Sequence, residues 1–110
     1  MKAQVETILL DLGGVPGGGF NRVAEGVLWA MEQPEPWSWR ATKQLYPAVA
    51  ARTGCNSSCA EKSMRNFIMT LWEHGDQEKL HMLFSNRKSP PRTKEFISIM
   101  AKRILVQTMQ

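Results

Sequence analysis

The stretch TKQLYPAVAARTGCNSSCAEKSMRNFIMTLW, residues 42–72, decides how we interpret this chain. Its first half carries apolar residues at helical spacing, which predicts a helix over about residues 42–52. Pro47 either kinks that helix or stands in the first turn of a helix that begins beside it. Gly54 can adopt the left-handed conformation that ends a helix. A helix followed by a short glycine-containing turn is the first part of a DNA-binding helix-turn-helix outline.

The second half of the stretch predicts a helix that begins with a capping box. The Ser58 hydroxyl can accept a hydrogen bond from the Glu61 amide, and the Glu61 carboxylate can reach back. The apolar residues that follow share one helical face: Ala60, Met64, Phe67, Ile68, Leu71 and Trp72. The two helices and the turn between them predict a helix-turn-helix over about residues 42–74.

The opposite face of this second helix offers polar groups that suit nucleic acid. It carries Ser58, Lys62, Arg65, Asn66 and Met69. Lys62 and Arg65 could contact phosphates or guanine, and Asn66 could pair with adenine. We expect Ser58 to cap the helix and to touch a phosphate, because a helix N-terminus favours anions. The alternative is a solvated face on an ordinary amphipathic helix.

Helical periodicity continues through the rest of the chain. A helix with Val5, Ile8, Leu9 and Leu12 on one face ends at Gly13, and a glycine-rich loop over residues 15–19 follows it. Further helices are predicted over about residues 20–31, over 78–84, and from Thr93, which can cap the last one. No segment alternates with strand periodicity. The sequence therefore predicts an all-α, compact single domain of about six helices over residues 1–110.

Composition and charge favour a polyanion as the partner. The chain has 110 residues, 43% of them hydrophobic, and a formal net charge of +4. Residues 1–36 have a balance of −3 and residues 37–110 a balance of +7, so the positive field belongs to the later part. No long apolar run or export signal is seen, and two cysteines do not make a disulfide scaffold. We expect a cytoplasmic protein with no membrane association.

The residues also suggest a family. The stretch at 42–50 and the stretch at 58–68, ending at Trp72, resemble the C-terminal effector domain of the master response regulator of bacterial sporulation, the stage 0 sporulation protein A family. Shorter similarities follow in the same order along the chain: Gly14-Val15-Pro16, Gly19-Phe20, Trp72-Glu73-His74-Gly75, Leu83-Phe84, Pro91 and Glu95-Phe96-Ile97.

The resemblance implies a six-helix domain whose recognition helix enters the major groove of short promoter boxes. It implies double-stranded DNA as partner, contact with RNA polymerase through its sigma subunit, and permits a dimer on DNA. Carried over by position, the DNA-binding residues are Ser58, Cys59, Lys62, Arg65 and Asn66. Cys59 stands where the family has an arginine and Asn66 where it has a histidine, so we expect a different or weaker sequence preference. The chain begins directly before the effector region, and we expect no receiver domain.

Other basic residues could contact the DNA backbone on either side of the recognition helix. The candidates are Lys43, Arg87, Lys88, Arg92 and Lys94. Each of them could equally be part of a solvated surface.

Other functions are less well supported by the sequence. The cysteines and histidines, Cys55, Cys59, His74 and His81, lack the spacing of a zinc site, so we expect no metal and no cofactor. The glycine loop lacks the Gly-Lys-Ser/Thr ending of a phosphate loop, and no catalytic set stands out, so we expect no enzyme. The main alternative is a protein-interaction module that keeps the fold, has lost DNA specificity, and modulates RNA polymerase or a full-length regulator.

Overall fold

The computed structural model describes residues 1–35, 38–85 and 87–108. Six α-helices account for most of these residues, and a five-residue π-helical segment, η1, precedes the third of them. The elements are α1 (Lys2–Asp11), α2 (Gly18–Glu32), η1 (Ala41–Leu45), α3 (Tyr46–Thr53), α4 (Ser57–His74), α5 (Gln77–Phe84) and α6 (Thr93–Thr108). The all-α prediction is confirmed.

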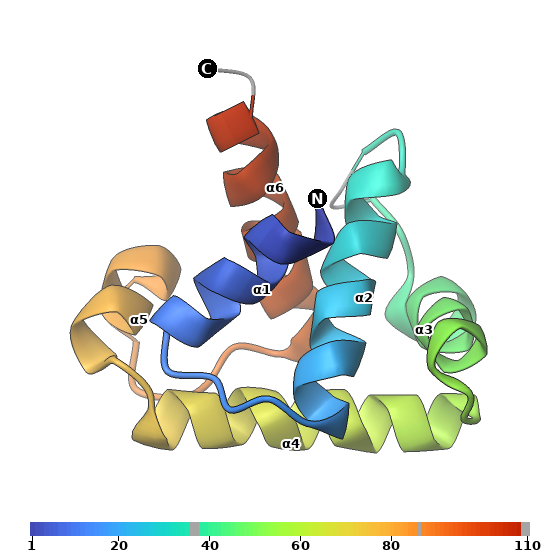
Figure 1. Ribbon diagram of the computed structural model, residues 1–110, viewed down its shortest axis with the longest axis horizontal. Coiled ribbons are helices and arrows are strands. Elements are labelled where there is room, and N and C mark those ends of the chain that lie inside the picture. Colours follow the sequence, from blue (N-terminus) through green and yellow to red (C-terminus); the bar gives the residue numbers. More distant parts are fainter. Residues whose placement is uncertain (36–37, 86, 109–110) are drawn as a thin grey trace.

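The longest helix, α4, forms the base on which the other helices stand. α2 and α6 rise from its middle, α3 lies at its N-terminal end and α5 at its C-terminal end (Figure 1). α1 lies above α4, against α2. The core fills the space where α1, α2, α4 and α6 meet, and its largest fully buried side chains include Leu9, Met64, Phe96, Ile97 and Met100. Burial on this scale holds α4 rigidly against the body of the domain.

Pro47 determines how the third helix begins. In a regular α-helix its ring would clash with the carbonyl of Lys43, and it has no amide hydrogen to donate. The chain instead forms a wider turn over η1, in which the Leu45 amide donates to the Arg40 carbonyl at 3.1 Å. α3 then starts at Tyr46 with Pro47 in its first turn. Of the two alternatives for Pro47, the structure shows the second: the regular helix begins beside Pro47, which stands in its first turn.

The predicted cap of α4 is wrong by two residues. The helix begins at Ser57, and the cap is Asn56, whose side chain accepts a hydrogen bond from the Cys59 amide at 2.8 Å. Ser58 is an exposed residue of the first turn. Asparagine is as good a cap as serine, and here the turn from α3 places Asn56 first.

The predicted cap of α6 is also displaced. Thr93 is the first residue of the helix, and its side chain is buried. The flanking position belongs to Arg92, whose amide donates to Glu95 Oε1 at 3.3 Å and whose carbonyl accepts from the Phe96 amide at 2.9 Å. The Glu95 carboxylate thus accepts a hydrogen bond from the Arg92 amide, as the third helical residue of a capping box does.

The tryptophan side chains differ in how deeply they are buried. Trp39 is 3% exposed and packs edge-on against Trp29. Trp72 is half-buried beside His81. Trp37 lies outside the described residues. No helix in the described part of the chain has the length and apolar character needed to cross a bilayer.

Candidate nucleic-acid interface

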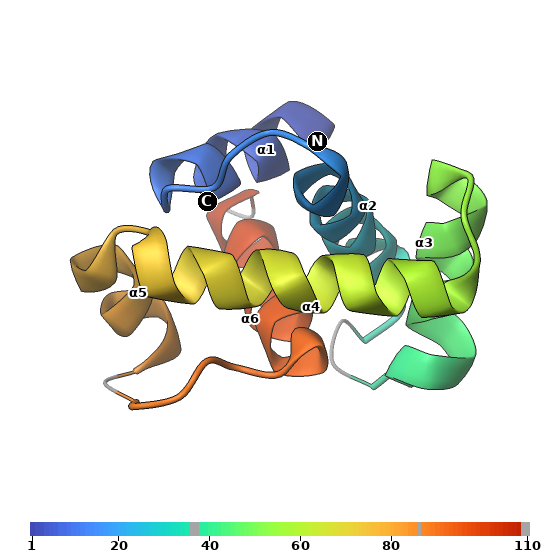
Figure 2. The same ribbon diagram turned by 90° about the horizontal axis from the view of Figure 1, so that it is seen from below.

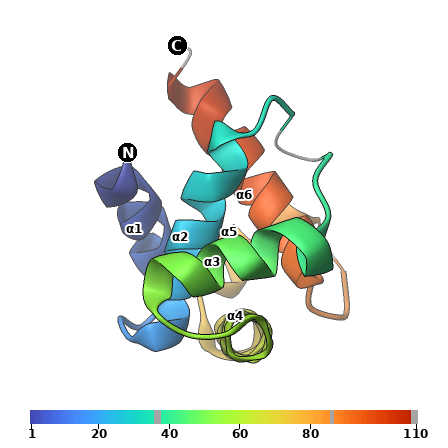
Figure 3. The same cartoon turned by 90° about the vertical axis from the view of Figure 1, so that its right-hand side faces the viewer.

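The helix α4 is a ridge on the surface of the domain. Seen from below, it crosses the whole molecule, with the loop after α1 along one side and the loop before α6 along the other (Figure 2). Seen end-on, it is the lowest element, beneath α3 (Figure 3). An α-helix with its side chains is about 10–12 Å across, which fits the major groove, about 12 Å wide. The ridge therefore has the shape required of a recognition helix.

The two faces of α4 divide as the sequence predicted. Toward the body of the domain, Ala60 and Met64 are fully buried, and Ile68 and Leu71 are nearly so. Away from the body, all the predicted DNA-facing residues are exposed: Ser58, Cys59, Lys62, Arg65, Asn66 and Met69. One face is fixed by packing, and the other is presented to solvent.

The cations of this outer face are available to a ligand. Among the described residues, no carboxylate forms an ion pair with Lys62. Arg65 has one partner, Glu61 on the preceding turn, at 3.6 Å, and the two side chains are 53% and 48% exposed. A long ion pair in water contributes little, so a phosphate or a base could replace Glu61 at small cost.

The residues predicted to contact the DNA backbone differ in whether they already have a partner within the protein. Lys43 on η1, Lys88 and Arg92 are exposed, and none of them has an ion-pair partner in the part of the chain that is described. Arg87 is held by Glu95 at 3.0 Å. Lys94 lies over the ring of Trp39, with Nζ 5.6 Å from its centroid. Arg87 and Lys94 therefore already have partners within the protein.

A surface hollow of about 300 Å³ brings Arg92 close to the recognition helix. It lies between α4 and the segment before α6, and Arg65, Met69, Tyr46 and Pro91 line it together with Arg92. Arg65 and Arg92 are far apart in the sequence, so only the fold brings these two residues to one depression. This arrangement suits a phosphate that passes beside α4.

Arg22 orients the helices at the interface, a role that no pattern in the sequence indicated. Its Nη1 donates to Ser63 Oγ on α4 at 3.0 Å, and its Nε donates to Thr53 Oγ1 at the end of α3 at 3.3 Å. A side chain on α2 thus links the two helices of the helix-turn-helix. Arg22 lies off the apolar stripe of its helix, and for that reason it looked like an ordinary surface residue.

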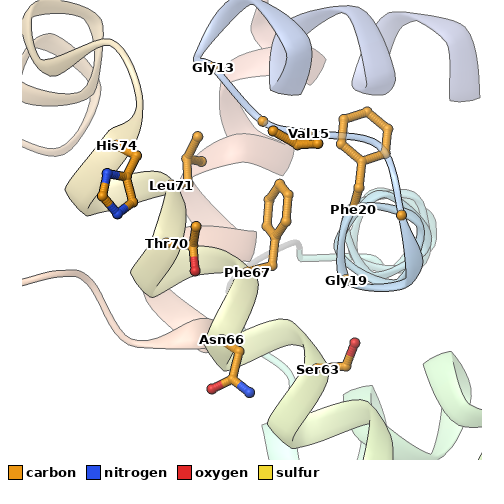
Figure 4. Close-up of a pocket in the computed structure, with 12 residues that line it drawn as sticks. Gly13, Val15, Gly19, Phe20, Ser63, Asn66, Phe67, Thr70, Leu71 and His74 are labelled. Carbon is orange, nitrogen blue, oxygen red and sulfur yellow. The ribbon is translucent and has the colours of Figure 1, made fainter.

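The predicted glycine loop over residues 15–19 ends earlier than expected, because Gly18 and Gly19 form the first turn of α2, and this turn and Gly14 before it pack directly against α4. A Cβ atom at Gly19 would lie 2.9 Å from Phe67 Cβ, and one at Gly14 would lie 3.0 Å from Phe67 Cζ. Phe67 points from α4 toward this segment between α1 and α2, beside a hollow of about 360 Å³ that Asn66 and His74 also line (Figure 4). The glycines therefore permit a close approach that a longer side chain would prevent.

Among the described residues, no three His, Cys, Asp or Glu side chains lie close enough together to hold a metal ion.

Residues 5–104 match the model of a protein family described as the sporulation initiation factor Spo0A C terminal. The match covers nearly the whole chain and includes all the helices that form the ridge and its support. It is a family of DNA-binding regulatory domains of sporulation and not a family of enzymes.

Proposed function

We propose that this chain, which belongs to the Spo0A C-terminal family, binds double-stranded DNA sequence-specifically, with α4 as the recognition helix of a helix-turn-helix over about residues 42–74. The observation that carries the proposal is the rigid seating of α4 with Lys62 and Arg65 on its free face. Lys62, Arg65 and Asn66 reach base edges or phosphates, and the first turn of α4, with Ser58 and Cys59, approaches the backbone.

The backbone contacts are proposed to differ in strength. Lys43, Lys88 and Arg92 have no internal partner to give up and should contribute most to the salt-dependent part of the binding. Arg87 must leave Glu95 before it can bind a phosphate, so its contribution should be small. Lys94 keeps its charge over Trp39 and adds to the field without needing to move.

The same proposal includes protein partners on DNA. When α4 occupies a groove, the surfaces of α1 and α5 remain outside it, and they carry the exposed apolar side chains Leu10 and Met82. These surfaces are available to the sigma subunit of RNA polymerase or to a second copy of the chain. A DNA-binding regulator of this kind acts in the cytoplasm.

The experiment is a selection of random DNA duplexes on the full chain, followed by affinity measurements on the selected sequence over a range of salt concentrations. We expect enrichment of a short sequence motif and an affinity that falls steeply as salt rises, because phosphate contacts release counterions. Lys62→Gln should lower the slope of log affinity against log salt by about 1.

Absence of any enriched motif, together with capture of RNA polymerase or a full-length regulator without DNA, would favour the protein-interaction module. Enrichment of a motif whose affinity does not change in Lys62→Gln and Arg65→Ala would show that another surface reads the DNA.

A further inference from the structure

The two sides of α4 differ in charge. The segment between α1 and α2 runs along one side, and η1 and the segment that leads into α6 lie on the other (Figure 2, Figure 3). Residues 87–95 on the second side include four basic residues and one acidic residue, whereas residues 13–20 on the first include no charged residue. A helix in the major groove has one sugar–phosphate backbone on either side, so each side of α4 would face a different strand.

The cationic flank, as we call η1, Arg65 and residues 87–95, presents exposed basic side chains. Arg65 and Arg92 line the same hollow of about 300 Å³ beside α4. Lys43 on η1 and Lys88 are exposed as well, and neither forms an ion pair with a described residue. Arginine and lysine side chains in such positions supply many of the phosphate contacts of DNA-binding proteins.

The carboxylates of the cationic flank do not cancel its charge. Glu61 lies 3.6 Å from Arg65, and both side chains are about half exposed. Glu95 is held at 3.0 Å by Arg87. The remaining cations of the flank therefore keep their charge for a phosphate.

The uncharged flank consists of residues 13–20, which include the first turn of α2, and of the side of α4 that faces them. The two parts enclose a hollow of about 360 Å³ (Figure 4). It is lined from α4 by Ser63, Asn66, Phe67, Thr70, Leu71 and His74. Val15 on the opposite wall is 75% exposed, and His74 lies 3.8 Å from the Glu73 carboxylate. A phosphate on this side would meet hydroxyl, amide, imidazole and apolar groups in place of lysine and arginine.

Basic side chains close to the uncharged flank are already bound within the protein. The Arg22 guanidinium, which lies next to Gly18, donates to Ser63 Oγ at 3.0 Å. Beyond the other end of the flank, Lys79 Nζ lies 2.7 Å from Asp11 and 4.0 Å from Asp76. Two carboxylates share one ammonium there, and the surplus negative charge opposes the approach of a phosphate.

We propose that this chain binds the phosphates of only one DNA strand with cations, the strand beside the cationic flank, and that the other strand passes an uncharged surface. The inference rests on the proposed function and adds which strand supplies the ionic contacts. Phosphate contacts fix the register and the orientation of a protein on a duplex. Because the contacts are one-sided, they distinguish the two strands of the site, and a single copy of the chain should bind in one orientation.

The test replaces single phosphates of the selected duplex by methylphosphonates, which are uncharged and of similar size, one position at a time along each strand. The affinity of the full chain for each duplex is measured over a range of salt concentrations. At contacted positions of one strand, the affinity should fall about tenfold, as expected for losing a hydrogen bond to a charged group. The slope of log affinity against log salt should fall there by about 0.9. Replacements on the other strand should change the affinity little.

Variants of the protein assign the strands to the two flanks. Arg92→Gln should bind the unmodified duplex more weakly, and the methylphosphonate at the phosphate that Arg92 contacts should then cost nothing more. Val15→Lys adds a cation to the uncharged flank. It should steepen the salt dependence by about 1 and make a position on the previously insensitive strand sensitive.

Val106→Lys is the matched control, because Val106 is 48% exposed near the end of α6 that lies away from α4 (Figure 1). It adds the same charge to the chain and should create no new sensitive position on either strand.

Comparable losses on both strands would overturn the inference and leave the proposed function intact. A Val15→Lys variant that gains no contact would overturn it as well, because residues 13–20 would then not face a backbone. If the full chain binds no duplex, the proposed function fails and the inference fails with it.

Discussion

The cations of the outer face of α4 and the cations elsewhere on the surface differ in their partners. Elsewhere, four basic side chains sit within 3.0 Å of a carboxylate oxygen: Lys2 with Glu25, Arg52 with Glu32, Lys79 with Asp11 and Arg87 with Glu95. On α4, Lys62 has no such partner among the described residues, and Arg65 has only the long contact with Glu61. These four cations are neutralised within the protein, whereas the cations on the outer face of α4, like Lys43, Lys88 and Arg92 beside it, are not held by a close carboxylate among the described residues.

This difference says more than the net charge of +4. An ion pair at 3 Å looks almost neutral from beyond a Debye length, about 8 Å at physiological salt. The paired cations therefore contribute little to the field that a polyanion meets, and the field is concentrated where α4 and its flanking loops protrude. The interface is defined by which cations the fold leaves unpaired.

The largest expected effect is the contrast between two variants, one that removes a cation from the outer face of α4 and one that removes a paired cation elsewhere. Arg65→Ala should weaken specific DNA binding by about 1–3 kcal/mol, because a guanidinium can contact a base edge or a phosphate with two hydrogen bonds. Lys79→Ala removes the same formal charge from α5, where Asp11 already neutralises it at 2.7 Å, and should leave the affinity unchanged. Fluorescence anisotropy with the selected duplex measures both.

Equal losses in the two variants would mean that the overall charge, and not the outer face of α4, drives binding.

A smaller effect is expected at the start of α4, on which the orientation of its outer face depends. Asn56→Ala removes the cap from the Cys59 amide and should lower the free energy of unfolding by about 0.5–2 kcal/mol. Ser58→Ala, two residues away, makes no cap contact and should change it by less than about 0.5 kcal/mol. Urea unfolding followed by circular dichroism compares them.

A larger loss in Ser58→Ala than in Asn56→Ala would restore the capping box that the sequence suggested.

The smallest expected effect concerns the paired region. Arg87 holds the pKa of the Glu95 carboxyl below its ordinary value near 4.5, with help from the Arg92 amide. Because the folded-state pKa is depressed, this contribution to stability is fully present above about pH 4.5 and is lost as the pH falls through the folded-state value. Since the pair is exposed, the contribution should stay below about 1 kcal/mol.

Unfolding of the native chain and of Glu95→Gln should therefore differ slightly at pH 7 and converge as the pH falls through the depressed folded-state pKa of Glu95. A difference that persists unchanged in acid would show that packing of the side chain, and not its charge, is responsible.

The pattern of apolar residues determined the helices and their inward faces. Ala60, Met64, Ile68 and Leu71 recur at helical spacing, and burial of that stripe is the main stabilising contribution available to a helix in water. The exposed set from Ser58 to Met69 follows as its geometric complement. The family resemblance rested on the same local patterns, and the match over residues 5–104 confirms it.

Tertiary contacts decided which residue performs each role. Ser58 and Asn56 are both good cap residues, and the short turn between α3 and α4 places Asn56 at the cap position. Gly75 follows the last residue of α4 with a φ of −79°, and a glycine is needed there because a Cβ would lie 2.5 Å from the Leu12 and Leu71 carbonyl oxygens.

The pairing of charges likewise has no local signature. Arg22 with Ser63, Lys79 with Asp11, and Arg65 beside Arg92 each join segments far apart in the chain. A single helix pattern specifies which way a side chain faces, because that depends on 3.6 residues per turn. What the side chain meets there depends on how whole helices pack, and that packing decided which cations stay free for DNA.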